Sequence, residues 1–333
     1  MIIGSIVENN QHETRTALTP DVVQKLTSLG HKVIIEKNLG IKSFFNNKSY
    51  KEKGATFLFP TEIIKRADIL LQINPPLPKY LKLLTSKQLL ISNFQNFNFQ
   101  TTSINSISIL LEKVPRTSVA QSIDILSSQS TVRGYIASIY CLAHSPLISP
   151  QLMTASTSIK PARALVLGAS TTGLQSASTF KRNGCIVTIL DINKENKSLA
   201  LSVGANLEIA PTKSSLHNLL SQTNFIVGSA SSHKNTPQII SKKDLKILPQ
   251  GCVIVDTTSQ NISLSTSKKS TQNYIFYRNQ NIERLCPQTS STFWSHNMLN
   301  LISLIAPNIN SINLNIPYLT PMIKKPDSNI SGD

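Results

Sequence analysis

The sequence predicts an α/β protein with two doubly wound parallel-sheet domains that are joined by long helices. Short apolar runs alternate with segments of helical periodicity in residues 1–112 and again in residues 162–306, which is typical of βα units. Between these regions, residues 118–143 contain no proline and repeat apolar residues at helical spacing. A chain of 333 residues is long enough for two domains that each bury a core.

The N-terminal half alternates between strand-like and helix-like segments. Residues 18–30 predict a helix, because Thr19 is suited to the N-cap, Pro20 to the first helical position and Gly30 to the end. A shorter helix is expected at residues 49–55. Strands are expected at residues 2–8, 31–36, 67–74, 87–93 and 106–112.

The second half begins with the helical stretch at 118–143, which predicts either one helix or two that meet near Gly134. Strands are then expected at residues 162–168, 185–191, 223–230 and 251–258, and helices at residues 173–184, 196–205 and 291–306. We place the domain boundary within the long helix. The first domain then contains residues 1–126 with 290–333, and the second contains residues 127–289. The polar tail at 324–333 is expected to fray.

Composition argues against several classes of protein. No run of 18 apolar residues predicts a transmembrane helix, and the N-terminus lacks a secretory signal. The four cysteines and six histidines are scattered, so we expect a reduced cytoplasmic protein without a metal site. The net charge is +16, but the basic residues are dispersed and no nucleic-acid motif accompanies them, so we expect no nucleic-acid partner.

A glycine-containing turn follows the strand at residues 162–168. Gly168 and Gly173 occupy the outer positions of the G-x-G-x-x-G pattern, and Ser170 replaces the middle glycine. The amides at the start of the next helix could hold a pyrophosphate. Ser170 adds a Cβ where the diphosphate approaches the backbone; its hydroxyl could donate to a phosphate oxygen, but we expect a net weakening of binding by about tenfold. Asp191 ends the following strand, where a carboxylate accepts hydrogen bonds from the adenosine ribose. The second domain is therefore predicted to be Rossmann-like and to bind NAD(H) rather than NADP(H).

Longer motifs resemble one family. Residues 116–137, RTSVAQSIDILSSQSTVRGYIA, resemble the signature of the NAD(H)-binding alpha subunits of proton-translocating NAD(P) transhydrogenases. The motifs MTA and KPARALVLGASTTGLQSASTFKRNGCIVTILD follow in the same order, and ETRTALTPDVVQKL, GCVIVD and SSTFWSHNMLNLI also fit. The resemblance runs from about residue 1 to residue 305. Alanine dehydrogenases share this fold and are the nearest related class.

The resemblance implies an activity and a set of partners. The chain would bind NAD(H) and exchange a hydride directly with NADP(H) on a partner beta subunit. A membrane subunit would couple this reaction to proton translocation, so the chain would be cytoplasmic and peripheral on the inner face of the cytoplasmic membrane. The family also implies a homodimer, for which the apolar helix around Trp294 is a candidate contact.

The resemblance also implies site residues. The catalytic loop of the family matches Arg116, Gln121 and Asp124, which would position the nicotinamide through an amide and an anchored ion pair. The turn and the resemblance together predict these cofactor-binding residues: Ser127, Gly168, Ser170, Thr171, Thr172, Gly173, Asp191, Ala230, Gln260 and Asn261.

The sequence departs from the family pattern at several positions. Val119 replaces a second arginine, Gln72 replaces a lysine, and the family's mobile loop has no clear equivalent. These departures keep open a catalytically weakened subunit, or a non-catalytic binding and assembly subunit. A third hypothesis is an alanine dehydrogenase-like amino-acid dehydrogenase, which would use Arg15 but would lack the usual lysine and histidine.

Overall fold

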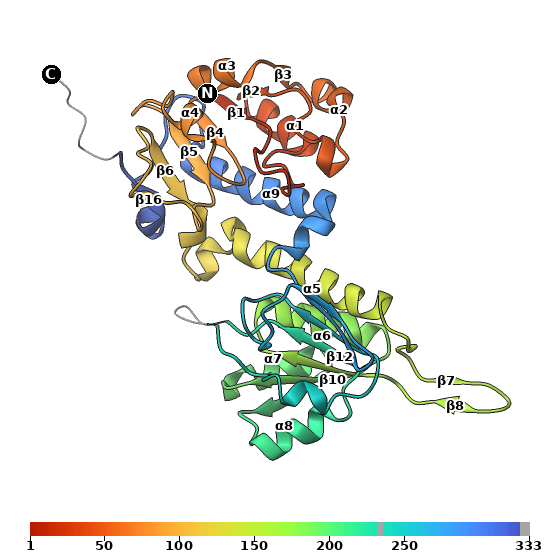
Figure 1. The fold of residues 1–333 in the computed structure, drawn as a ribbon. Helices are drawn as coiled ribbons and strands as arrows, with labels where there is room; N and C mark the ends of the chain where they lie inside the picture. Colours follow the sequence, from red (N-terminus) through yellow and green to blue (C-terminus); the bar gives the residue numbers. More distant parts are fainter. Residues whose placement is uncertain (232–235, 327–333) are drawn as a thin grey trace. The chain divides into compact units, whose positions relative to one another are not determined.

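Two seven-stranded sheets form the framework of the protein (Figure 1). The structure is a computed structural model that describes residues 1–231 and 236–326. The chain divides into unit 1, Met1–Gln129 with Arg284–Asp333, and unit 2, Ser130–Glu283. Both sheets are mainly parallel and carry helices, which confirms the predicted α/β fold class. Within the described ranges, no helix is long and apolar enough to cross a membrane.

Unit 1 has the strand order β16-β6-β5-β4-β1-β2-β3, in which only β16 is antiparallel to its neighbour. Its strands are β1 (Ile2–Ser5), β2 (Lys32–Ile35), β3 (Thr56–Phe57), β4 (Ile69–Leu71), β5 (Leu89–Ser92), β6 (Ile107–Leu110) and β16 (Ile323–Lys324). Its helices are α1 (Pro20–Ser28), α2 (Asn47–Glu52), α3 (Pro60–Arg66), α4 (Pro78–Leu81) and α9 (Pro287–Ile305). The predicted helix at 18–30 corresponds to α1, which buries Val22, Val23 and Leu26. Of the predicted frayed tail, residues 327–333 lie outside the described residues.

Unit 2 has the strand order β11-β10-β9-β12-β13-β15-β14, in which only β14 is antiparallel to its neighbour. Its strands are β9 (Arg163–Leu167), β10 (Ile186–Asp191), β11 (Asn206–Ile209), β12 (Phe225–Gly228), β13 (Cys252–Asp256), β14 (Lys268–Ser270) and β15 (Tyr274–Arg278). The helices α6 (Thr171–Arg182), α7 (Lys197–Ser202) and α8 (Lys213–Leu220) connect them. A two-stranded hairpin, β7 (Leu152–Met153) with β8 (Ser158–Ile159), projects from this unit (Figure 1). The sequence does not predict seven of the strands that the structure describes in the two units: β3, β7, β8, β11, β14, β15 and β16.

The predicted long helix breaks earlier than expected. Ser118–Ile123 form a 3-10 helix, and α5 then covers Ile125–Ala143. Asp124 separates the two, because its carboxylate accepts the Ser127 N–H at 3.0 Å and so caps α5. Gly134, where the sequence suggested a junction, lies inside α5. A Cβ at this position would come within 2.3 Å of the Thr172 carbonyl oxygen, so the glycine lets α5 approach α6 closely.

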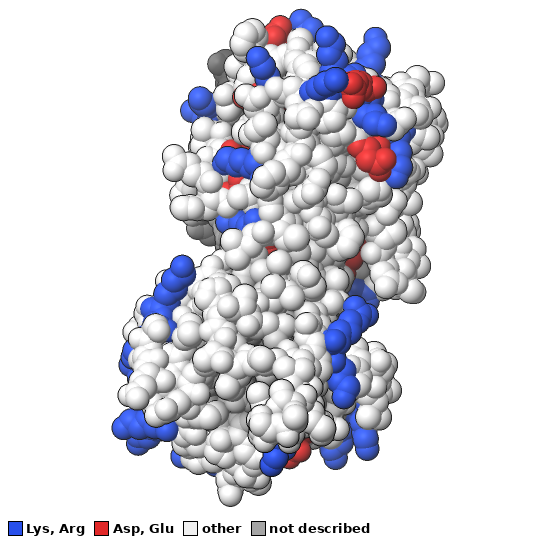
Figure 2. Space-filling model, turned by 90° about the vertical axis from the view of Figure 1, so that its right-hand side faces the viewer, with Lys and Arg blue, Asp and Glu red and all other residues white. Residues whose placement is uncertain are grey.

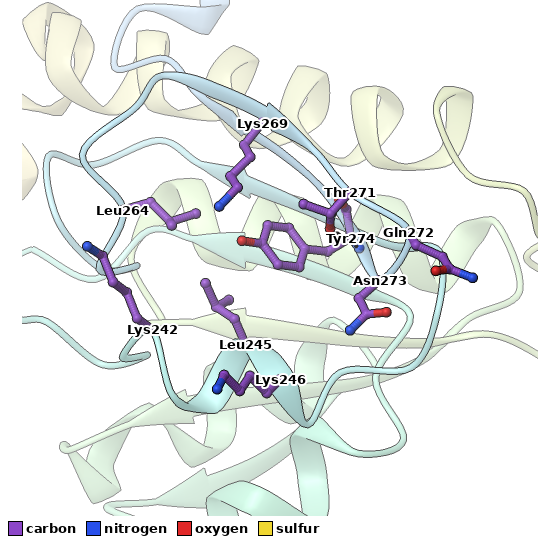
Figure 3. Close-up of a pocket in the computed structure, with 9 residues that line it drawn as sticks. All are labelled: Lys242, Leu245, Lys246, Leu264, Lys269, Thr271, Gln272, Asn273 and Tyr274. Atoms are coloured by element: carbon purple, nitrogen blue, oxygen red, sulfur yellow. Dashed lines mark hydrogen bonds between the residues drawn. The ribbon is translucent and has the colours of Figure 1, made fainter.

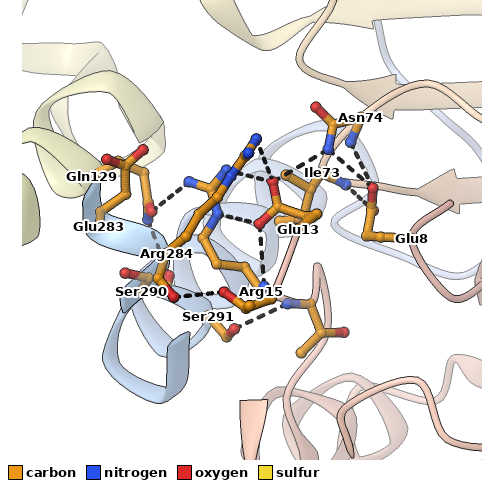
Figure 4. A network of polar contacts seen from close by, with 12 residues as sticks. Glu8, Glu13, Arg15, Ile73, Asn74, Gln129, Glu283, Arg284, Ser290 and Ser291 are labelled. Carbon is orange, nitrogen blue, oxygen red and sulfur yellow. Dashed lines mark hydrogen bonds and ion pairs between the residues drawn. The ribbon is translucent and has the colours of Figure 1, made fainter. Parts of the chain in front are cut away.

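A buried polar network anchors the N-terminal segment of unit 1 (Figure 4). Arg15 Nε lies 2.7 Å from Glu13 Oε1, and Arg284 Nη2 lies 3.0 Å from Glu13 Oε2. Burial raises the pKa of Glu13, but the two guanidinium groups outweigh this effect and hold it below its usual range. Arg15 also lies 5.4 Å above the ring of Trp294, which is 1% exposed. The Trp294 side chain itself belongs to the core of unit 1, so a contact between two copies through this helix would have to use its exposed residues, such as Phe293.

Replacing Gly134 by alanine tests the packing of α5 against α6. Helix propensity alone would stabilise the protein by about 1 kcal/mol. The contact with the Thr172 carbonyl oxygen predicts instead a net loss of about 1–3 kcal/mol in the free energy of unfolding. Urea unfolding of Gly134→Ala and of the wild type would measure the difference, and a stabilised variant would contradict the close approach.

Candidate nucleotide-binding site

Two glycines set the geometry of the turn between β9 and α6. Gly168 has a φ of +93°, and a Cβ there would come within 2.7 Å of the Ala230 Cα. A Cβ on Gly173 would come within 1.9 Å of the Gly168 carbonyl oxygen. Both positions therefore require glycine, the first for its left-handed backbone and both for space. The turn brings the start of α6 against the carboxyl end of β9.

The Ser170 side chain is engaged within the protein. It is the N-cap of α6, and its Oγ accepts the Gly173 N–H at 3.2 Å. The same hydroxyl donates its proton to the Ser229 carbonyl oxygen at 3.0 Å. A hydroxyl has one proton to donate, so Ser170 Oγ has none left for a phosphate oxygen in this arrangement.

Two backbone N–H groups at the start of α6 have no hydrogen-bond partner among the described residues, and we call them the open amides. In the part of the chain that the structure describes, the N–H groups of Thr171 and Thr172 make no hydrogen bond. Thr171 is exposed, whereas the Thr172 side chain is buried and donates to the Ser130 carbonyl oxygen at 3.3 Å. Open amides at a helix N-terminus are a binding site for an anion. Thr171 and Thr172 could therefore hold a pyrophosphate through their backbones.

Asp191 lies at the end of β10, the strand that pairs with β9. One carboxylate oxygen accepts the Ala169 N–H at 2.6 Å, and the other accepts the Asn193 N–H at 2.8 Å. These bonds fix the carboxylate beside the turn. A carboxylate has about four acceptor positions, so lone pairs remain for the hydroxyls of a ribose.

Among the predicted residues beyond β12 and β13, Asn261 has a structural role. Asn261 is fully buried; its Oδ1 accepts the Ala230 N–H at 2.9 Å, and its Nδ2 donates to the Ala230 and Pro237 carbonyl oxygens at 2.9 and 2.8 Å. The amide of Asn261 is thus committed to holding Ala230 against Gly168 rather than to contacting a ligand. Gln260 is exposed, and its Nε2 donates to the Thr236 carbonyl oxygen.

Three supporting residues were missed by the sequence analysis. Ser229 Oγ donates to the Leu167 carbonyl oxygen at 2.8 Å and ties β12 to the turn. Asp256, at the end of β13, is fully buried and pairs with Arg278 at 2.9 Å. An acid directly after the apolar run CVIV signals a special position. Nothing in the sequence indicates that Arg278 is its partner.

The predicted catalytic loop belongs to unit 1, and the turn belongs to unit 2. Arg116 and Gln121 are exposed. Asp124 accepts the hydroxyl and the N–H of Ser127, and among the described residues Arg116 forms no ion pair. Asp124 thus caps α5 in this structure, and its expected ion pair with Arg116 stays a prediction.

A metal site, a reactive cysteine or a basic patch would each indicate other chemistry. Within residues 1–231 and 236–326, no group of three or more histidine, cysteine or acidic side chains could hold a metal ion. The cysteines are free, and burial raises the pKa of Cys185 to about 12, so this thiol is not a nucleophile at neutral pH. Figure 2 shows lysines and arginines dispersed over the face in view rather than gathered in one patch.

Comparisons with known proteins place this geometry in a family. The N-terminal domain model of alanine dehydrogenase/PNT matches residues 4–133, and the C-terminal domain model matches residues 139–330. The first part of the NAD(P) transhydrogenase subunit alpha of Rickettsia prowazekii is 31% identical over 293 residues, which cover 78% of this chain and 76% of that protein. NAD(P) transhydrogenase subunit alpha of Haemophilus influenzae is 28% identical, with 96% of this chain and 68% of that protein covered.

Solved structures show the same fold. A transhydrogenase from Sinorhizobium meliloti has a TM-score of 0.89 at 21% identity, with 97% of this chain and 98% of that chain covered. An L-alanine dehydrogenase has a TM-score of 0.77 at 20% identity, with 92% and 90% covered. The chain therefore belongs to the alanine dehydrogenase/PNT family, and its similarity to transhydrogenase alpha subunits confirms the resemblance carried by its motifs.

Proposed function

We propose that this chain is the NAD(H)-binding subunit of a proton-translocating NAD(P) transhydrogenase. The observation that carries the proposal is the pairing of two open amides, those of Thr171 and Thr172, with the Asp191 carboxylate fixed beside them by Ala169. The amides would bind the pyrophosphate, and the carboxylate would bind the adenosine ribose. A carboxylate at this position would also repel a 2′-phosphate, so the site favours NAD(H) over NADP(H).

The reaction that fits this site is direct hydride transfer to or from NADP(H) on a partner subunit. Such a transfer moves a proton and two electrons between two nicotinamide rings, and it needs orientation rather than a general acid or base. Arg116 and Gln121 are exposed, and the resemblance assigns them to the loop that positions the nicotinamide. Asp124 accepts hydrogen bonds from the Ser127 N–H and hydroxyl, so this acid would fix the start of α5 behind the loop rather than carry a proton.

The partners follow from the same proposal. A beta subunit would supply NADP(H), and a membrane subunit would hold this chain at the inner face of the cytoplasmic membrane and couple the reaction to proton translocation. A homodimer is also part of the proposal. The hairpin of β7 and β8 supports it, because Leu152, Met153 and Ile159 are exposed apolar residues that a second copy could cover.

The alternatives receive unequal support. An amino-acid dehydrogenase would need a free guanidinium for a 2-oxo acid, but Arg15 directs its donors to Glu13 and Gln129. Gln72 is likewise buried and donates to the Ile6 carbonyl oxygen at 3.0 Å. A weakened or non-catalytic binding subunit remains the second candidate, because the Ser170 hydroxyl is engaged within the protein.

Titration with NADH and NADPH, followed by nucleotide fluorescence, tests the nucleotide site. We expect NADH to bind more tightly, and Asp191→Asn to weaken NADH binding about tenfold through the loss of charge-assisted hydrogen bonds. Glu195→Gln is the matched control, since it removes the same charge from an exposed position four residues away. Absence of NADH binding at millimolar concentration would contradict the proposal.

Replacing Ser170 by glycine is predicted to increase the affinity for NADH. Ser170→Gly removes a Cβ beside the expected diphosphate. It also removes the hydrogen bond to the Ser229 carbonyl oxygen, while glycine at an N-cap costs helix stability only a few tenths of a kcal/mol. We expect NADH to bind up to about tenfold more tightly, as measured by calorimetry. Weaker binding would instead show that the serine side chain stabilises the complex.

The loop residues should affect transfer more than binding. With the partner subunits present, we expect Arg116→Ala and Gln121→Ala to slow hydride transfer by about a hundredfold through misorientation of the ring, with little change in NADH affinity. Val119→Ala is the control, because Val119 is exposed on the same 3-10 helix. Full activity in both loop variants would favour the non-catalytic alternative.

A further inference from the structure

A polar cavity lies at the edge of the unit 2 sheet, away from the turn. It has a volume of about 470 Å³ and is lined by Lys242, Leu245, Lys246, Leu264, Lys269 and Tyr274, among others (Figure 3). Tyr274 begins β15 and pairs with Cys252 at the start of β13. Gly168 instead follows the carboxyl end of β9, which stands two strands from β13 in the sheet. The proposed NAD(H) site therefore does not include this cavity.

The sheet and a short 3-10 helix build the cavity from opposite sides. Lys269 on β14 pairs with Phe276 on β15, so its side chain shares a face of the sheet with Phe276 and Tyr274. The segment Asp244–Lys246 packs Leu245 into the apolar cluster below this face. Lys246, the last residue of this segment, and Lys242, two residues before its start, line the cavity.

Tyr274 gives the cavity a polar group without a partner. The residue is 8% exposed, and its hydroxyl points into the space among Leu264, Lys242 and Lys269 (Figure 3). In the described parts of the chain, this hydroxyl makes no hydrogen bond. The hydroxyl is thus open to the cavity, where a bound anion could accept its hydrogen bond.

The charge around the cavity is uncompensated. Unit 2 contains 15 lysines and arginines against 6 acidic residues, and three of these acids, Asp244, Asp256 and Glu283, are buried. Asp244, the acid between Lys242 and Lys246, is held by His217 at 2.9 Å and by the Ser241 hydroxyl at 2.7 Å. Within the described residues, none of the three lining lysines forms an ion pair. An anion of at least two charges would relieve their repulsion.

We propose that this cavity binds a small phosphate-bearing anion. The three lysines would neutralise phosphate oxygens as point charges, and the Tyr274 hydroxyl would donate to one of them. Leu245 and Leu264 would cover the apolar part of an organic phosphate. The volume of the cavity lies within the range of small-molecule sites.

Calorimetric titration of the full chain with inorganic pyrophosphate at low ionic strength tests this site. We expect the double variant Lys242→Gln with Lys269→Gln to bind at least about tenfold more weakly. The matched control is Lys243→Gln with Lys268→Gln, because these neighbouring lysines carry the same charge but do not line the cavity. We expect this control to retain wild-type affinity, and Tyr274→Phe to bind a few-fold more weakly.

Three outcomes would overturn the proposal: no binding of pyrophosphate, equal affinity in both double variants, or unchanged affinity in Tyr274→Phe. Equal affinity would place the anion elsewhere, for example at the start of α6. Thermal unfolding of each variant would verify that the fold is intact. Vesicles of phosphatidylcholine with phosphatidylglycerol distinguish the source of the phosphate, since competition with pyrophosphate identifies a lipid headgroup and its absence identifies a soluble ligand.

Discussion

The contact between Gly168 and Ala230 is the constraint on which the nucleotide site depends. Gly168 follows β9 with a φ of +93°, and a Cβ at this position would lie only 2.7 Å from the Ala230 Cα. Only glycine therefore allows the two backbones to come this close. The Asn261 side chain holds Ala230 in place, because it accepts the Ala230 N–H and donates to the Ala230 carbonyl oxygen. The start of α6 is thereby fixed beside the Asp191 carboxylate, which a loosely held turn could not achieve.

This constraint explains how the turn keeps its shape without the middle glycine. Ser170 takes the N-cap of α6 and also donates to the Ser229 carbonyl oxygen, so its side chain joins the turn to the end of β12. The buried pair of Asp256 and Arg278 holds the loop that carries Asn261. Removing one partner of such a pair leaves an uncompensated buried charge and typically costs about 3–5 kcal/mol. The site thus depends on contacts that reach from β9 to β15.

The sequence predicts those parts of the fold and site that local rules determine. Apolar periodicity located the main strands and α1, and the glycine spacing with Asp191 located the turn. Three contacts could not be predicted, because each joins residues that are distant in the chain. Asn261 binds the backbone of Ala230, Arg278 pairs with Asp256, and Arg15 covers the buried ring of Trp294. Nor does the sequence show that Asp124 caps α5 through the Ser127 amide, because that bond depends on where the helix begins.

A crystal structure of the chain with NADH tests the central claim most directly. The open amides predict that pyrophosphate oxygens accept hydrogen bonds from the N–H groups of Thr171 and Thr172, while the Asp191 carboxylate binds the adenosine ribose. The Ser170 hydroxyl should remain on the Ser229 carbonyl oxygen. A dinucleotide bound elsewhere in unit 2, or a pyrophosphate that has no contact with the start of α6, would contradict the assignment of the turn.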